Sequence, residues 1–214
     1  MFAIPDLPFW HRIAPMTHEL FLALLGFAFV TSVTPGPNNM MLLASGANFG
    51  FRRTLPHMLG ISIGHSVMVV LVGLGIAGLF TAWPPALLIL KAASVAYMLW
   101  LSWKIAHASA PGEGKRSARP MTFLQAAAFQ WVNPKAWAMA LGAVAAYVPE
   151  PSVQAYLAVA LVFSAVNLPS VSLWAAAGQV VREWLQTPAR LKAFNWTMAV
   201  LLVLSLWPVV MMDL

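Results

Sequence analysis

Two short motifs hold the residues that could do chemistry, and each lies inside a long apolar stretch. Pro35-Gly36-Pro37-Asn38 interrupts the first such stretch, and Asn133-Pro134-Lys135 interrupts the fourth. Proline removes a backbone donor and obstructs the carbonyl four residues earlier, so each motif predicts a broken helix. The N–H groups and dipole at each new helix start favour an anion, and Lys135 adds a full positive charge. A carboxylate is the simplest ligand for such a site.

Acceptors for a cation are predicted beside this anion site. Four prolines are expected to free carbonyls within the apolar stretches, those of Thr31, Val33, Gln130 and Ala165. Asn38, Asn39 and Asn167 add amide oxygens. We predict that Asn38, Asn39, Asn133 and Lys135 bind the carboxylate of an α-amino acid, and that the freed carbonyls and Asn167 bind its amine. Since no Asp or Glu lies deep in these stretches, a neutral amino acid is favoured over a basic one.

Two titratable side chains are candidates for moving protons. Lys135 and His65 both lie within apolar stretches, and an ionisable residue at such a depth is by default a functional hypothesis. For His65 the alternative is a hydrogen bond to the backbone of a neighbouring helix. No second histidine is placed in the membrane interior, so neither a metal site nor a cofactor is expected.

The composition is that of an all-α integral membrane protein. Of 214 residues, 61% are hydrophobic and 8% are charged, whereas a soluble domain carries about 25% charged residues. Cysteine is absent, which excludes disulfides and thiolate sites. The net charge of +6 comes mainly from loops between apolar spans, which indicates orientation in a membrane and no nucleic-acid partner.

The apolar stretches predict six transmembrane helices. The first and fourth are long because each is broken near the bilayer midplane. The predicted spans are 20–47, 57–80, 86–106, 121–147, 153–176 and 192–211, and 179–191 is expected along the cytoplasmic surface.

The spans divide into two halves of three. Residues 1–19 form an N-terminal extension, 20–107 a first repeat, 108–120 a basic cytoplasmic linker and 121–214 a second repeat. Three spans per half require opposite orientations, so the halves are predicted to form an inverted 3+3 repeat. Matching landmarks are Pro37, His65 and Lys91 in one half and Pro134, Asn167 and Lys192 in the other.

Orientation follows from the basic residues. Nine lysines and arginines fall in three loop regions on one side, and Arg12 alone falls on the other. By the positive-inside rule these loops are cytoplasmic, which places both termini in the periplasm of a bacterium.

The motifs resemble those of the lysine exporter / homoserine-threonine resistance (LysE/RhtB) family of bacterial amino-acid exporters. The matching segments are 34–42, 46–50, 60–64, 96–104 and 133–136. The resemblance implies six spans, export from the cytoplasm and coupling to the proton gradient. Two departures are Ser94 and Ser102, where glycine is usual. Asn38 stands where some members have Asp, which counts against basic substrates.

The sequence therefore predicts a secondary exporter of small neutral amino acids, threonine-, homoserine- or leucine-like, in the bacterial inner membrane and driven by proton antiport. The alternatives are export of basic amino acids or of another solute such as a divalent cation; a membrane assembly factor is less favoured, and no enzyme is expected. Gly60 and Gly64 form a GxxxG pair that either packs within the chain or supports a homodimer.

Overall fold

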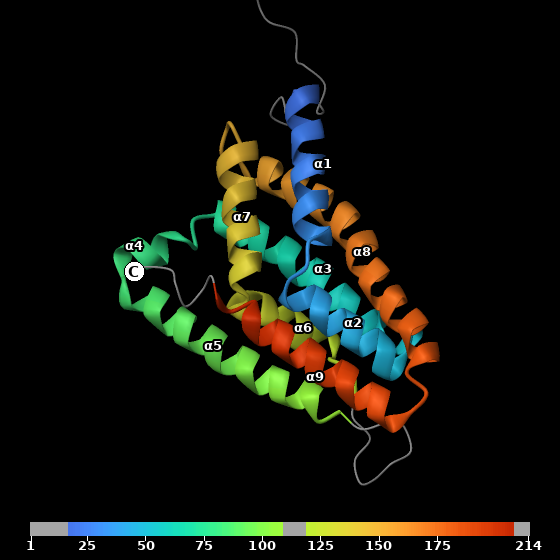
Figure 1. The fold of residues 1–214 in the computed structure, drawn as a ribbon. Coiled ribbons are helices and arrows are strands. Elements are labelled where there is room, and N and C mark those ends of the chain that lie inside the picture. Colours follow the sequence, from blue (N-terminus) through green and yellow to red (C-terminus); the bar gives the residue numbers. More distant parts are fainter. Residues whose placement is uncertain (1–16, 109–118, 208–214) are drawn as a thin grey trace, which may run out of the picture.

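The computed structural model describes residues 17–108 and 119–207, and this part of the chain is helical with no strand (Figure 1). Most of the predicted N-terminal extension and linker, and the end of the sixth predicted span, lie outside the described residues. In chain order the elements are α1 (His18–Val33), α2 (Pro37–Phe49), α3 (Phe51–Gly73), α4 (Gly78–Ala82), α5 (Pro85–Ala106), α6 (Phe123–Phe129), the 3₁₀ helix η2 (Gln130–Val132), α7 (Pro134–Tyr147), α8 (Val153–Trp184) and α9 (Pro188–Leu204).

The helix breaks at the first proline motif, as the sequence predicts. α1 ends at Val33, α2 begins at Pro37, and the two axes meet at 55°. Pro37 occupies the first helical position, where its missing N–H is not needed. The prolines of this motif therefore account for where the helix breaks.

The second motif breaks the chain in the same way. α6 gives way to η2, Asn133 is extended, and α7 begins at Pro134. The Asn133 side chain caps α7 by accepting the backbone N–H of Lys135 at 3.1 Å.

Two predicted boundaries are wrong. The second span was expected from 57, but α3 begins at Phe51, because Gly50 at φ +81° lets the chain turn at once from α2 into α3. The fifth was expected to end at 176, but α8 continues through Pro169 to Trp184, which takes in half of the segment assigned to the membrane surface. Proline alone does not break a helix that neighbouring helices support.

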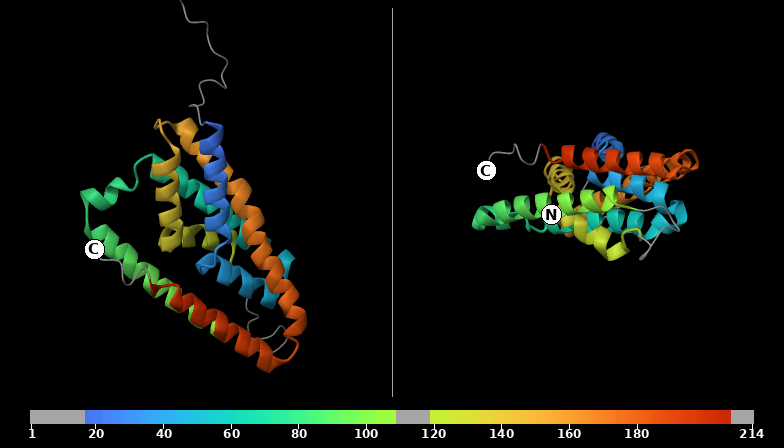
Figure 2. Two further views of the ribbon diagram at one scale, coloured as in Figure 1. Left: turned by 45° about the horizontal axis from the view of Figure 1, so that its top comes forward. Right: turned by 60° about the horizontal axis from the view of Figure 1, so that its bottom comes forward.

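The helices pack around α8, which contacts α1, α2 and α3, while α5 and α9 lie side by side as a separate layer (Figures 1 and 2). Small residues allow the closest approaches. A Cβ at Gly178 would lie 2.9 Å from the backbone nitrogen of Ala47, so α2 and α8 touch backbone to backbone. Likewise, a Cβ at Gly64 would lie 2.6 Å from the Cα of Ala127 in α6. Gly60 and Gly64 thus pack within the chain, and a homodimer stays a prediction.

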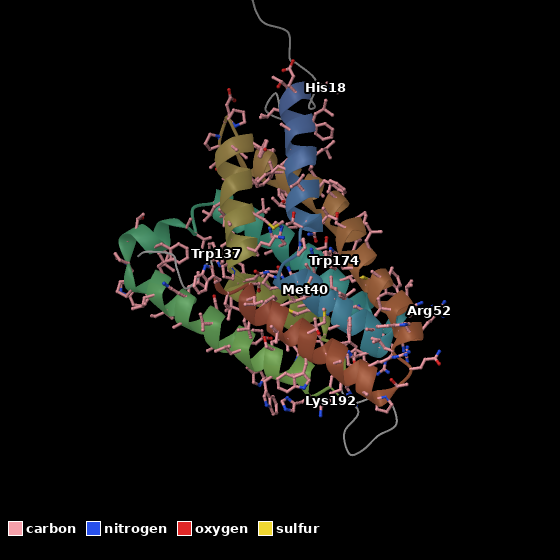
Figure 3. The ribbon with its side chains drawn as sticks, viewed as in Figure 1. His18, Met40, Arg52, Trp137, Trp174 and Lys192 are labelled. Atoms are coloured by element: carbon pink, nitrogen blue, oxygen red, sulfur yellow. The ribbon has the colours of Figure 1, made fainter. Side chains whose placement is uncertain are left out.

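Three helices, α3, α5 and α8, are long and apolar enough to cross a membrane, and a fourth span arises if the bent pair α1 and α2 counts as one. The six spans and their inverted repeat stay predictions. His18 lies at one end of the molecule and the basic residues Arg52 and Lys192 lie at the other (Figure 3).

Candidate functional site

The two breaks lie against each other around a small, partly open space, here called the central cavity. α1, α2, α3, α7 and α8 all contribute to its wall. It is lined by Thr31, Ser32, Gly36, Asn38, Asn39, Ile61, His65, Gln130, Asn133, Lys135, Ala136, Met139, Asn167 and Val171. Its volume of about 20 Å³ leaves room for about one water molecule. This space must therefore expand before it can hold an amino acid.

Most of the residues predicted for the site meet at this cavity. Gly36, Asn38, Asn39, Asn133, Lys135, Asn167 and His65 all line it. Pro35, Pro37 and Pro134 do not, and their part is to shape the backbone.

Lys135 connects the second break to the first. Its ammonium donates to the Thr34 carbonyl at 2.7 Å and reaches the Pro35 carbonyl at 3.5 Å. An ammonium has three N–H donors, so one remains for another acceptor. The lysine therefore already satisfies backbone groups that the first break exposes, a role that the sequence did not predict.

Gly36 lets the lysine reach across. A Cβ at Gly36 would lie 2.8 Å from Cδ of Lys135 and 3.1 Å from its Nζ. Both distances are shorter than van der Waals contact, so any larger residue would displace the side chain of Lys135.

A pair of amides forms the second link between the breaks. Asn38 Nδ2 donates to Gln130 Oε1 at 2.9 Å, and Gln130 Nε2 donates back to Asn38 Oδ1 at 3.2 Å. Gln130 also donates to the Ala126 carbonyl and is fully buried. It was missed as a site residue, although a glutamine inside an apolar stretch is itself a signal that a partner lies nearby.

Within residues 17–108 and 119–207, two buried amide oxygens at the cavity have no hydrogen-bond partner, Asn39 Oδ1 and Asn167 Oδ1. Asn39 Nδ2 donates to the carbonyls of Ser32 and Thr34, both at 2.8 Å, which fixes the orientation of the amide. Asn167 Nδ2 donates to Ser32 Oγ at 3.1 Å. An unsatisfied buried acceptor costs about 1–3 kcal/mol, so both oxygens favour a donor such as an ammonium group. Ser32, which holds both asparagines, was also missed.

Two of the carbonyls expected to be free are already bound. The Val33 carbonyl accepts Trp174 Nε1 at 3.1 Å, and the Gln130 carbonyl accepts the N–H of Asn133 at 3.2 Å. Each of these carbonyls keeps one lone pair for a second donor, so the expectation that they bind an amine stays a prediction.

His65 lies at the wall of the cavity with its ring 5.1 Å from that of Phe163. The backbone of Ala136 is beside it, but neither ring nitrogen makes a hydrogen bond of normal geometry. A second histidine, His57, lies eight residues earlier on α3 and is also buried within the protein. The prediction that no second histidine shares the membrane interior stays a prediction. About 12 Å of helix separates the two histidines, and the described residues hold no group of three metal ligands.

Enlarging Gly36 should impair amino-acid flux without unfolding the protein. In Gly36→Ala the new methyl group displaces the flexible Lys135 side chain from the Thr34 carbonyl. Loss of a charged hydrogen bond worth about 1.5 kcal/mol corresponds to about a tenfold fall in flux. Flux in proteoliposomes and the thermal midpoint of unfolding would be measured together. Gly78→Ala, where no atom lies within 4 Å of the new Cβ, is the control, and equal flux in both variants would contradict the assignment.

Comparison with known proteins finds relatives that match most of the chain. The chain is 32% identical over 190 residues to a cysteine/O-acetylserine efflux protein of Klebsiella pneumoniae. The aligned region covers 88% of this chain and 95% of the relative. It is 32% identical over 192 residues to proteins of the same name from Escherichia coli K12 and Shigella flexneri, covering 88% of this chain and 96% of each. No solved structure matches the chain significantly. The model of the LysE type translocator family matches residues 29–205, and this chain belongs to that family of bacterial efflux transporters.

Proposed function

We propose that this protein exports small neutral amino acids from the cytoplasm across the bacterial inner membrane, as a secondary transporter driven by proton antiport. One observation carries the proposal. The central cavity between the two helix breaks combines the Lys135 ammonium with two unpartnered amide oxygens, those of Asn39 and Asn167. A positive group beside free acceptors is the complement of a zwitterion.

The carboxylate of the substrate binds to Lys135 and to the N–H groups at the starts of α2 and α7. Its ammonium group binds Asn39 Oδ1 and Asn167 Oδ1. The lining residues include no Asp or Glu, which favours a neutral side chain over a basic one. The apolar lining residues Ile61, Met139 and Val171 suit a short side chain.

The names of the relatives add two candidate substrates. Proteins 32% identical to this one are named for efflux of cysteine and O-acetylserine. These two compounds therefore join threonine, homoserine and leucine as the candidates of choice. All are small, and none has a charged side chain near neutral pH.

Binding is coupled to movement through Lys135. Lys135 belongs to the second half of the chain, and its hydrogen bond to the Thr34 carbonyl holds the break of the first half. A substrate carboxylate competes for the same ammonium, so binding weakens the link between the halves. The packing of α1 against α8 and of α6 against α3 supports an inverted repeat whose halves rock about the cavity.

Removing the ammonium should stop transport. Lys135→Ala is expected to lower counterflow of radiolabelled threonine or O-acetylserine in proteoliposomes by about a hundredfold, the effect of about 2.7 kcal/mol, at normal membrane levels of protein. The control is Lys192→Ala, which removes an exposed lysine and should leave counterflow unchanged. Normal counterflow in Lys135→Ala would remove the anion site from the proposal.

Proton coupling should depend on His65. Histidine is the side chain that most readily changes charge between pH 5 and 8, whereas His65→Asn keeps hydrogen-bonding groups but cannot titrate there. We expect this variant to retain counterflow, which needs no net proton movement, and to lose uptake driven by an imposed pH gradient. Gradient-driven uptake equal to that of the parent would exclude His65 as the proton carrier.

The C-terminus should lie in the periplasm. The positive-inside rule places the three basic loop regions in the cytoplasm and the C-terminus on the other side of the membrane. Alkaline phosphatase fused after Leu214 should therefore be active, and a fluorescent protein that folds only in the cytoplasm should be dark. The reverse result would overturn the orientation, while leaving the cavity and its ligand as proposed.

A further inference from the structure

A second and larger cavity, here called the vestibule, lies on the other side of α2 from α8. Its volume is about 610 Å³, enough for an amino acid with its water. α2, α5, α6 and residues 119–122 supply most of its wall, and His57 of α3 completes it. Its far end is buried at Met41, Ser45 and Leu101.

The vestibule opens at the basic end of the molecule. Its exposed lining residues are Lys104, Arg119, Thr122 and Gln125. They lie at the end of α5, just before α6 and in its first turn, at the end of the molecule where α9 begins (Figure 1). Among the described lining residues, Lys104 and Arg119 are cations and none is a carboxylate, and this charge favours the acidic end of a zwitterion.

An apolar layer separates the vestibule from the central cavity, and the order of residues along three elements reveals it. On α3, His57 lines the vestibule, Ile61 is buried in the layer and His65 lines the central cavity. These positions lie four residues apart and therefore follow one face of the helix.

The other two elements repeat this order. On α2, Leu42 lies between Ser45 at the vestibule and Asn38 at the central cavity. In the fourth stretch, Ala126 lies between Thr122 at the vestibule and Gln130 at the central cavity. The separation between the two cavities is thus one layer of apolar side chains.

The opposite side of the central cavity is closed more thoroughly. Among the described residues, the cluster that includes Leu24, Met68 and Phe163 has 13 buried members, whereas the layer toward the vestibule belongs to a cluster of six. The thin layer is therefore the one that opens with less loss of packing.

His57 is a polar side chain of the vestibule with no partner. It is 1% exposed, and neither ring nitrogen has a hydrogen bond. Its buried polar neighbours are satisfied, since Ser45 bonds to Thr54 at 2.9 Å and Asn48 to Asn195 at 2.8 Å. The imidazole thus has unused donor and acceptor capacity at the wall of the vestibule, which a bound molecule reaches once the side chains that cover the ring nitrogens move.

We propose that the vestibule is a second substrate site, where the amino acid is loaded from the cytoplasmic side. The carboxylate of the amino acid lies toward Lys104 and Arg119, and the rest of the molecule extends toward His57. The layer of Leu42, Ile61 and Ala126 is the gate through which the amino acid passes to the central cavity. This inference rests on the proposed function for the identity of the ligand.

Cysteine labelling tests the site directly, because the chain has no native cysteine. Ser45→Cys should react with the anionic, membrane-impermeant reagent sulfonatoethyl methanethiosulfonate in inverted vesicles and not in right-side-out vesicles. L-threonine or O-acetyl-L-serine at about ten times the half-saturating concentration should slow labelling about tenfold. Ala44→Cys, also at the vestibule wall, serves if Ser45→Cys folds poorly. Ser170→Cys, buried in α8, is the control that should not react.

The outcomes separate this proposal from the central site. Protection should persist when Lys135→Ala is added to Ser45→Cys, because Lys135 does not line the vestibule. Loss of protection in that double variant, or labelling that no amino acid slows, would overturn the loading site while leaving the proposed export intact. Reaction only in right-side-out vesicles would overturn its cytoplasmic side.

The gate has its own test. Ser32→Cys reports on the central cavity, and adding Ile61→Ala should raise its labelling rate in inverted vesicles several-fold by thinning the layer. Val180→Ala, which trims a side chain that is 69% exposed, is the matched control. Equal rates in the two backgrounds would show that the layer is not the gate.

Discussion

Backbone polar groups need hydrogen-bond partners in a medium without water, and this need governs the fold. A helix that crosses a bilayer satisfies its own N–H and C=O groups, and a broken one exposes several of them. Here the first break is closed by side chains from other parts of the chain: Lys135 binds Thr34, Asn39 binds Ser32 and Thr34, and Trp174 binds Val33. The broken helices are therefore held by the same contacts that build the site.

The sequence predicted the parts of this arrangement that depend on local chemistry. Proline acts on its own neighbours, so the break at 34–36 and the start of α7 at Pro134 could be placed within a residue or two. The lysine was assigned to the site because a charge in an apolar stretch needs a polar environment. That residues of both motifs would line one cavity followed from their matching places in the two halves.

The sequence could not predict which partner each group finds. The position of Gln130 in an apolar stretch signals a partner but does not identify it as Asn38, and nothing local marks Ser32 as the partner of Asn39 and Asn167. His57 was missed for a related reason. Its burial depends on where α3 begins, which Gly50 and the contact of α3 with α6 determine. Pro56 and Pro169 look like breaks in the sequence, yet each lies inside a continuous helix.

The site differs from a simple anion pocket in how its hydrogen bonds are distributed. Most donors are already used. Two of the three N–H groups of the Lys135 ammonium face carbonyls, and the backbone N–H of Lys135 donates to Asn133 Oδ1. Acceptors are left over at Asn39 and Asn167. An ammonium group therefore gains immediate partners, whereas a carboxylate finds one free N–H on Lys135 and gains the other two only by exchange with the carbonyls of Thr34 and Pro35.

That exchange gives the substrate a means of moving the protein. A ligand shifts a conformational equilibrium only by its difference in affinity for the two states. In the closed state the ammonium of Lys135 shares its hydrogen bonds between the carbonyls of the first break and any ligand. In an open state, with the two breaks apart, all of its N–H groups are available to the carboxylate. One charged hydrogen bond of about 2 kcal/mol made only in the open state shifts the equilibrium about thirtyfold. A single lysine that closes the empty protein can thus favour opening once an amino acid is bound, because the contact that holds the two breaks together is the contact that the substrate replaces.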